Sequence, residues 1–301
     1  MFRSVRLYRL NSEWPDDEQA LSERLAAAAF RPCGAYAERS SGWEPPAGDA
    51  DPLLARRVTG ADLIRLRTQS RLLPAAAVED ALEVRLEEYR ARTHEEPSRR
   101  EKRRLKQQTR DELMPKALLK SERTQALVLG SERLIAVDTL SAPRAERFLD
   151  HLRAPLGSLD VVPLEFKRPF GDLLMRIFNG EAPRGFVLGR ECKMQDPSDT
   201  KATVRCSDMD LADPAVRKHV KDGMRLTHLG VEFGNVVSCV LDHQGGIGKL
   251  KLLGSDERDE AEEDPLARLD AEIALLAGTL RQLIAAIAEA LGSGGEAERA
   301  A

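Results

Sequence analysis

The sequence predicts an α+β protein in which helices cover antiparallel sheets. Strand-like and helix-like stretches alternate along the chain, and short turns join neighbouring strands into hairpins. Three strand-like runs at 225–233, 236–242 and 248–253 are joined by glycine-containing turns, which is typical of an antiparallel meander. A long helix is expected from Asp264 and Pro265 onward, because leucine and isoleucine recur there at spacings of three and four residues.

Further strands are expected where apolar residues alternate with polar ones or form a short run between turns: 2–11, 63–72, 126–129, 134–140, 159–164, 185–188 and 202–206. Further helices are expected where apolar residues recur every three or four positions, or where a helix-capping residue is present. These helices are 16–30, Pro74 through Tyr89, 143–153, 172–178 and 214–221. Pro74 and Pro214 occupy a first helical position, where proline loses no hydrogen bond. Trp43, in the proline-rich turn 43–48, is expected to pack over a small core rather than stack on a base.

The final helix has two possible roles. Its apolar stripe continues from Leu266 to Leu291 for nearly four heptads, and Gly292 ends it. The stripe could form a seam with a partner helix or cover the sheet, and we favour covering because amphipathic stripes usually face a core. An acidic run at 256–264 precedes this helix, and we expect it to be a solvated loop.

The middle of the chain carries a concentrated basic run. Residues 98–110 read SRREKRRLKQQTR, with one acid, Glu101. Ser98 and Glu101 match a capping box, which predicts the start of a helix. The candidate contacts for a polyanion are Arg99, Arg100, Lys102, Arg103, Arg104, Lys106 and Arg110, of which Arg99, Arg103, Lys106 and Arg110 share one helical face. Most of these bases lie near the helix N-terminus, where the helix dipole opposes positive charge. The run is either a solvated face or a nucleic-acid contact, and about a dozen helical residues would span roughly 18 Å of phosphate backbone.

The composition limits the classes of function. The net charge of −4 over 301 residues argues against a protein that binds polyanions by bulk charge. Aromatic residues are only 4% of the chain, which favours a duplex held by its phosphates over single strands stacked on aromatic rings. Four scattered cysteines predict reduced thiols in a cytoplasm. We expect no secretory signal and no apolar segment long enough to span a membrane.

Catalytic motifs are weak. The run 245–249, GGIGK, lacks the first glycine and the Ser or Thr of a phosphate loop, so we interpret it as a hairpin turn. Asp208 and Asp210 could hold a metal ion for a nuclease, although two alternate acids more often face solvent. No cofactor is expected, and no motif argues for an enzyme.

Three ordered blocks of sequence resemble one known family. These blocks are Phe30-x-Pro32-Cys33-Gly34 followed by Gly42-Trp43-x-Pro45-Pro46, then Leu156-Gly157-Ser158-Leu159-x-Val161-Val162-Pro163-Leu164, then Leu250-Lys251-Leu252 with the acidic run and final helix. With the opening run at 5–10, they make the chain similar, nearly end to end, to the recombination-associated RdgC family of bacterial nucleoid proteins.

The resemblance implies a protein without enzymatic activity that binds double-stranded DNA, and single-stranded DNA more weakly, with little sequence preference. It implies a ring-shaped homodimer that encircles the duplex and restrains the RecA recombinase. A projecting pair of helices, the second of them basic, would line or guard the hole, and Leu118 and Leu119 would form a dimer contact at its tip. Lys116, Arg205, Arg217, Lys218 and Lys221 join the DNA-binding candidates. The chain departs from the family at Leu118, where an aromatic residue is usual, and at Asp208, where a basic contact is usual.

These observations predict one RdgC-like chain, 1–301, with four subregions: an N-terminal α+β part at 1–73, the helical pair and tip at 74–123, a central α+β part with the meander at 124–255, and the acidic linker and final helix at 256–301. We expect a cytoplasmic, nucleoid-associated protein with no membrane partner. Two alternatives stay open: a metal-dependent nuclease that uses Asp208 and Asp210, and a module that binds the recombinase directly.

Overall fold

The computed structural model describes residues 2–253 and 264–293. The chain divides into two compact units. The larger unit contains the described residues of 2–27, 45–65 and 124–293, and the smaller unit contains 28–44 and 66–123. Of the predicted acidic run, only Asp264 belongs to the described residues.

The first sheet has seven strands, in the order β2-β4-β5-β6-β1-β7 with β3 added beside β4. Their bounds are β1 Arg6–Leu10, β2 Arg39–Glu44, β3 Ala55–Val58, β4 Ala61–Leu72, β5 Leu118–Leu129, β6 Leu134–Val137 and β7 Val161–Pro163. The strands expected at 126–129 and 134–140 form a hairpin, because β5 and β6 pair antiparallel with Leu129 opposite Leu134. β4 and β5 are long strands that pass from one unit into the other.

The second sheet lies wholly in the larger unit and has five strands, in the order β12-β11-β10-β8-β9. Their bounds are β8 Phe186–Gln195, β9 Thr203–Cys206, β10 Arg225–Phe233, β11 Val237–Asp242 and β12 Ile247–Leu252. Every neighbouring pair is antiparallel, so the predicted meander is confirmed. Buried and more exposed residues alternate along β11, which leaves one face of the sheet for the core.

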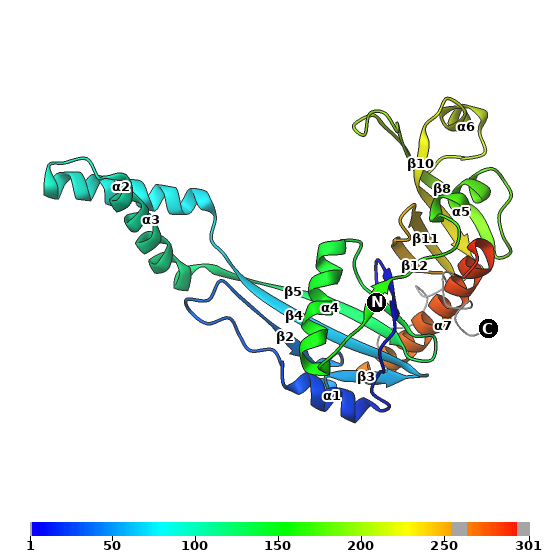
Figure 1. Cartoon of the computed structure of the whole chain (residues 1–301), viewed down its shortest axis with the longest axis horizontal. Helices are drawn as coiled ribbons and strands as arrows, with labels where there is room; N and C mark the ends of the chain where they lie inside the picture. The colour runs from blue at the N-terminus through cyan, green and yellow to red at the C-terminus, as the bar shows by residue number, and fades with distance from the viewer. Residues whose placement is uncertain (1, 254–263, 294–301) are drawn as a thin grey trace. The chain divides into compact units, whose positions relative to one another are not determined.

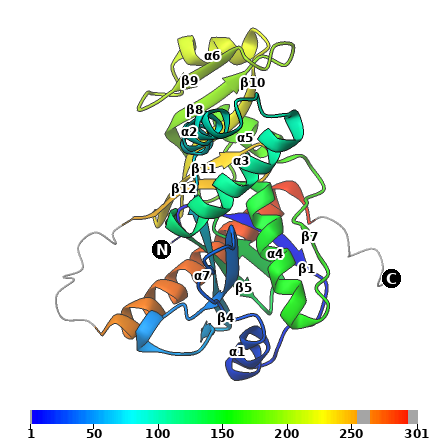
Figure 2. The same ribbon diagram turned by 90° about the vertical axis from the view of Figure 1, so that its left-hand side faces the viewer.

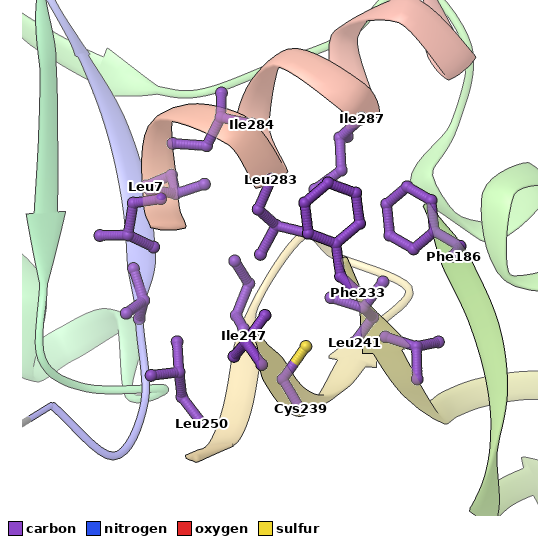
Figure 3. Packing of buried hydrophobic residues seen from close by; sticks show 14 of the residues in the cluster. Leu7, Phe186, Phe233, Cys239, Leu241, Ile247, Leu250, Leu283, Ile284 and Ile287 are labelled. Carbon is purple, nitrogen blue, oxygen red and sulfur yellow. The ribbon is translucent and has the colours of Figure 1, made fainter. Parts of the chain in front are cut away.

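Helices cover this core. The larger unit holds α1 Glu18–Ala26, α4 Ala142–Leu156, α5 Phe170–Phe178, α6 Pro214–Lys221, α7 Pro265–Leu291 and the short 3-10 turn η1 Gly48–Ala50. Figure 3 shows Leu283 and Ile287 of α7 directed at Phe233, Leu241 and Ile247 of the second sheet. The covering role that we favoured for the final helix is therefore confirmed, and burial of this stripe is the main contribution that α7 makes to stability.

One expectation about membranes is wrong. By length and composition, α7 is a helix that could cross a membrane, although we expected no segment of that kind. In this fold its apolar side chains are used in the core: Leu280, Leu283 and Ile287 are fully buried in the larger unit.

The smaller unit contains β2, residues 66–72 of β4, residues 118–123 of β5, and two helices. These helices are α2 Ala75–Thr93 and α3 Arg99–Leu113, and the 3-10 turn η2 Met114–Lys116 follows them. α2 and α3 pack against each other (Figures 1 and 2). Val78, Leu82 and Leu86 of α2 are buried, as the predicted stripe requires.

Several predicted elements differ from the structure. Trp43 is buried as expected, with 1% of its surface exposed, but it belongs to β2 rather than to a turn. Strands β2 and β3 were not predicted, because their polar residues give no alternating pattern. Pro74 is the N-cap of α2 rather than its first helical residue. β5 begins eight residues earlier than predicted, at Leu118 instead of Ala126, so the expected apolar tip is the start of a strand.

Candidate nucleic-acid interface

The basic helix α3 begins at the predicted capping box. The Ser98 backbone N–H donates to Oε2 of Glu101 at 2.9 Å, and the Glu101 N–H donates to Oγ of Ser98 at 3.2 Å. Hydrogen bonds from the Ser98 side chain and backbone lower the pKa of Glu101 to about 2. The ionised carboxylate also offsets part of the unfavourable interaction between the helix dipole and the basic residues that follow.

One side of α3 is used for packing against α2. Thr109 is buried there and donates from its hydroxyl to the Leu105 carbonyl at 2.8 Å. The Tyr89 hydroxyl of α2 donates to Oε1 of Glu101 at 2.8 Å, which ties the two helices together near the start of α3. The basic side chains of α3 lie outside this packed side and are exposed.

Ion pairs divide the predicted basic face into two halves. Lys106 pairs with Glu79 of α2, and Nη2 of Arg110 lies 2.5 Å from Oε1 of Glu38. Five other basic residues of α3 have no carboxylate within ion-pair distance in the described part of the chain: Arg99, Arg100, Lys102, Arg103 and Arg104. The unpaired charge is therefore concentrated in the first two turns of the helix.

The helical pair is electrostatically asymmetric. Between Arg99 and Leu113, α3 carries seven basic and three acidic residues, whereas α2 carries three basic and five acidic residues. The net charge is therefore positive on α3 and negative on α2. An exposed row of unpaired guanidinium groups at i and i+4 suits successive phosphate oxygens, because arginine binds phosphate through two parallel hydrogen bonds.

The junction between η2 and β5 is held by a residue that the sequence did not single out. Nη1 of Arg71, on β4, donates to the carbonyls of Pro115 and Ala117 at 3.2 Å each. Lys116 lies between these two carbonyls and is exposed. Leu118 and Leu119 follow, with 76% and 47% of their surfaces exposed. An arginine that binds the carbonyls on either side of Lys116 thus positions both a basic residue and the apolar pair that follows.

The other predicted DNA contacts lie in the larger unit. Arg205 on β9 and Lys218 and Lys221 on α6 are exposed. Arg217 is different, because it is half-buried and its Nη2 donates to the Phe178 carbonyl at 3.2 Å. Its guanidinium group therefore joins α6 to the end of α5, and only part of it is accessible to a ligand.

The two acids considered for a metal are used in local contacts. Asp208 is an exposed residue with a left-handed backbone, φ +52°, and its Oδ1 accepts from Nε of Arg190 at 2.6 Å. Oδ1 of Asp210 accepts from the Ala212 N–H at 2.9 Å. Among residues 2–253 and 264–293, no three His, Cys, Asp or Glu side chains come together as a metal site.

Comparison with known proteins decides the family. A family model described as "Putative exonuclease, RdgC" matches residues 1–294. The chain is 32% identical over 295 residues to the recombination-associated protein RdgC of Edwardsiella ictaluri, covering 97% of each chain. This chain belongs to the RdgC family. The RdgC protein of Shewanella oneidensis is also 32% identical, over 297 residues, and that of Laribacter hongkongensis is 33% identical over 298 residues, with 98% of this chain and 99% of the relative covered.

Two of the sequence blocks that resemble the RdgC family have clear structural roles. In the first, Trp43 makes backbone hydrogen bonds to both Ala28 and Phe30, at 3.0 and 2.8 Å, so the tryptophan fixes the segment after α1. In the second, Gly157 ends α4 with a φ of +76°, a conformation that favours glycine, and the chain then enters β7. In this RdgC-family chain, Trp43 and Gly157 therefore have roles in the fold.

Proposed function

We infer that this RdgC-family protein binds double-stranded DNA through its phosphates, with little dependence on base sequence. The row of exposed, unpaired bases on the first half of α3 carries this proposal. Phosphate contacts supply affinity without sequence information, and no aromatic residue accompanies them on α3 to stack on single-stranded bases. Single-stranded DNA is therefore expected to bind more weakly than a duplex.

The proposal includes a homodimer that closes into a ring around the duplex. The exposed pair Leu118 and Leu119, fixed beside Lys116 by Arg71, supports a contact between two copies, because adjacent large apolar residues on a surface favour a protein partner. A ring on the duplex would obstruct the RecA recombinase, and the names of the relatives, recombination-associated proteins, agree with a role in that process. The protein would act in the cytoplasm, associated with the nucleoid.

Salt dependence tests the DNA contact. Binding of a labelled duplex and of a single strand of equal length should be measured from low to moderate salt. We expect tight duplex binding that is insensitive to sequence, with a log–log slope of about −0.9 per phosphate contact. An absence of duplex binding at low salt would contradict the proposal.

Topology tests the ring. Complexes assembled on a closed circular plasmid should survive a high-salt wash better than complexes on the same plasmid after linearisation, because a ring slides off free ends. Sedimentation of the protein alone should give twice the mass of one chain. Equal loss from circular and linear DNA would argue for an open clamp.

Two alternatives have their own readouts. Inhibition of RecA that persists after the unpaired bases of α3 are replaced would favour a module that binds the recombinase directly. The family model's description names an exonuclease, so DNA cleavage is the second alternative. Magnesium-dependent degradation of DNA that Asp210→Ala abolishes would support it.

A further inference from the structure

A second cluster of unpaired arginines lies in the larger unit, at the C-terminal end of α7. Arg168, Arg176 and Arg184 line a pocket of about 350 Å³ together with Pro183, Ala286, Ala290 and Glu289. The three arginines come from three segments: the stretch before α5, α5 itself, and the loop between α5 and β8. None of them was a candidate from the sequence, because each lies eight residues from the next and the three therefore form no local cluster.

The backbone around the pocket is well fixed. The N–H groups of Lys167 and Arg168 donate to the carbonyls of Gly292 and Leu291, each at 3.1 Å, so the segment before α5 is joined to the end of α7. The Glu181 N–H donates to the Arg176 carbonyl at 2.8 Å, which joins the loop to α5. A site formed here would be pre-organised and would not need to fold around its ligand.

Two of the guanidinium groups converge on one atom. Nη2 of Arg168 and Nη1 of Arg176 both donate to the carbonyl oxygen of Ala290, Arg176 at 3.3 Å. Capping of the helix C-terminus explains these two bonds. It uses one N–H donor of each side chain, whereas a guanidinium group has five. Arg184 makes no hydrogen bond or ion pair with any described residue.

The charge in this pocket is not balanced. No carboxylate lies within ion-pair distance of Arg168, Arg176 or Arg184 in the described part of the chain, and Glu289 is the one acid in the lining. Three cations around one concave surface repel each other unless an anion lies between them. The pocket is large enough for a small ligand, and planar guanidinium groups match the oxygen geometry of phosphate.

We propose that Arg168, Arg176 and Arg184 form a phosphate-binding site, separate from α3. The shared chemistry is a phosphate group, which a DNA backbone or a free phosphate can supply. If the phosphate belongs to DNA, the inference rests on the proposed function and adds a contact in the larger unit. If it is free, the site exists independently of DNA binding.

Free phosphate is tested by thermal unfolding of the full chain. Inorganic phosphate is titrated against sodium chloride of equal ionic strength, because a ligand that binds only the folded state raises Tm with the logarithm of its concentration once that concentration exceeds Kd. We expect the wild type and Arg147→Gln to show this rise and Arg184→Gln to lose it. Arg147 is a matched control, since it is an exposed arginine of α4 with no partner among the described residues. Arg184→Gln is preferred over Arg168→Gln and Arg176→Gln, each of which also removes a hydrogen bond to the Ala290 carbonyl at the end of α7.

DNA is tested by the salt slope of duplex binding. If a DNA phosphate occupies the pocket, Arg184→Gln should lower the slope by about one unit while α3 is intact. Loss of the phosphate-induced rise in the Arg184 variant supports the site even if the protein fails to bind duplex, so the two proposals fail separately. A rise in Tm that Arg184→Gln leaves unchanged, or no rise together with an unchanged slope, would overturn the proposal.

Discussion

Gly42 on β2 passes so close to Phe30 that a β-carbon on Gly42 would lie 2.5 Å from the Phe30 Cα atom. The neighbouring Trp43 exchanges backbone hydrogen bonds with the same segment. The glycine and the tryptophan thus act together: the first allows the approach and the second holds it.

Gly42→Ala is therefore expected to destabilise the smaller unit. Backbone atoms must move to accept the methyl group, and overpacking of this kind costs about 1–3 kcal/mol of unfolding free energy. Gly130→Ala is the control, because a β-carbon there meets nothing within 4 Å. Urea unfolding of both variants measures the difference. Equal stability of the two variants would mean that the segment around Phe30 adjusts freely.

Ser98→Ala is expected to lower the stability of α3. The hydroxyl oxygen accepts the Glu101 N–H, and loss of such a cap typically costs about 1 kcal/mol. Ser141→Ala is a matched control, since Ser141 is the N-cap of α4 but its side chain makes no capping hydrogen bond. Amide hydrogen exchange in the first turns of the two helices should rise in α3 and stay unchanged in α4. A rise in both would point to a general effect of the substitution.

The same capping box predicts that the stability of α3 depends on pH in the acidic range. The pKa of Glu101 is lowered to about 2 in the folded protein, so its ionised form contributes stability above its ordinary pKa of 4.5. That contribution is lost as the pH falls from 4.5 toward 2. Hydrogen exchange at the start of α3 should accelerate over this range, and Glu101→Gln should remove the dependence. A profile that Glu101→Gln does not alter would assign it to other carboxylates.

Buried thiols predict that the stability of the folded protein falls as the pH rises into the alkaline range. Burial raises the pKa of Cys239 to about 12, and burial together with the facing Cys206 raises that of Cys192 to about 12. The folded protein retains protons that the unfolded chain releases above about pH 9, so stability should fall as the pH rises from 9 toward 12. Cys239→Ala should weaken this fall in urea unfolding measured at pH 8 and pH 10.5. Rapid alkylation of Cys239 at pH 8 without denaturant would contradict its burial.

The sequence was most informative where periodicity or capping chemistry dominates. The stripe of α7, the meander and the capping box at Ser98 all follow from local spacing, and each is present in the structure. β2 was missed because its sequence, RSSGWE, is polar, and the strand depends on the close approach between Gly42 and Phe30. That approach joins residues whose proximity no local pattern reveals.

For the same reason, only part of the candidate site could be predicted from the sequence. The basic run itself is visible in the sequence, whereas the acids that pair with two of its seven basic residues are not. Glu79 lies 27 residues from Lys106, and Glu38 lies 72 residues from Arg110. Pairing across such separations depends on how α2 and the segment before β2 pack, so tertiary structure was needed to separate paired from unpaired charge.

The distinction between paired and unpaired basic residues on α3 gives the last prediction. Arg99→Gln with Arg103→Gln removes two unpaired charges, and Lys106→Gln with Arg110→Gln removes two paired charges from the same helix. Both double variants lower the net charge equally, so any difference between them reports local phosphate contacts rather than the general field of the protein. We expect the first variant to lower the salt slope of duplex binding by about 1.8 units, at about 0.9 per phosphate, and the second to lower it much less. The second effect is smaller because Lys106 and Arg110 must leave Glu79 and Glu38 before they can bind DNA. Equal effects would show that only bulk charge matters, and no effect in either variant would leave α3 as a solvated face.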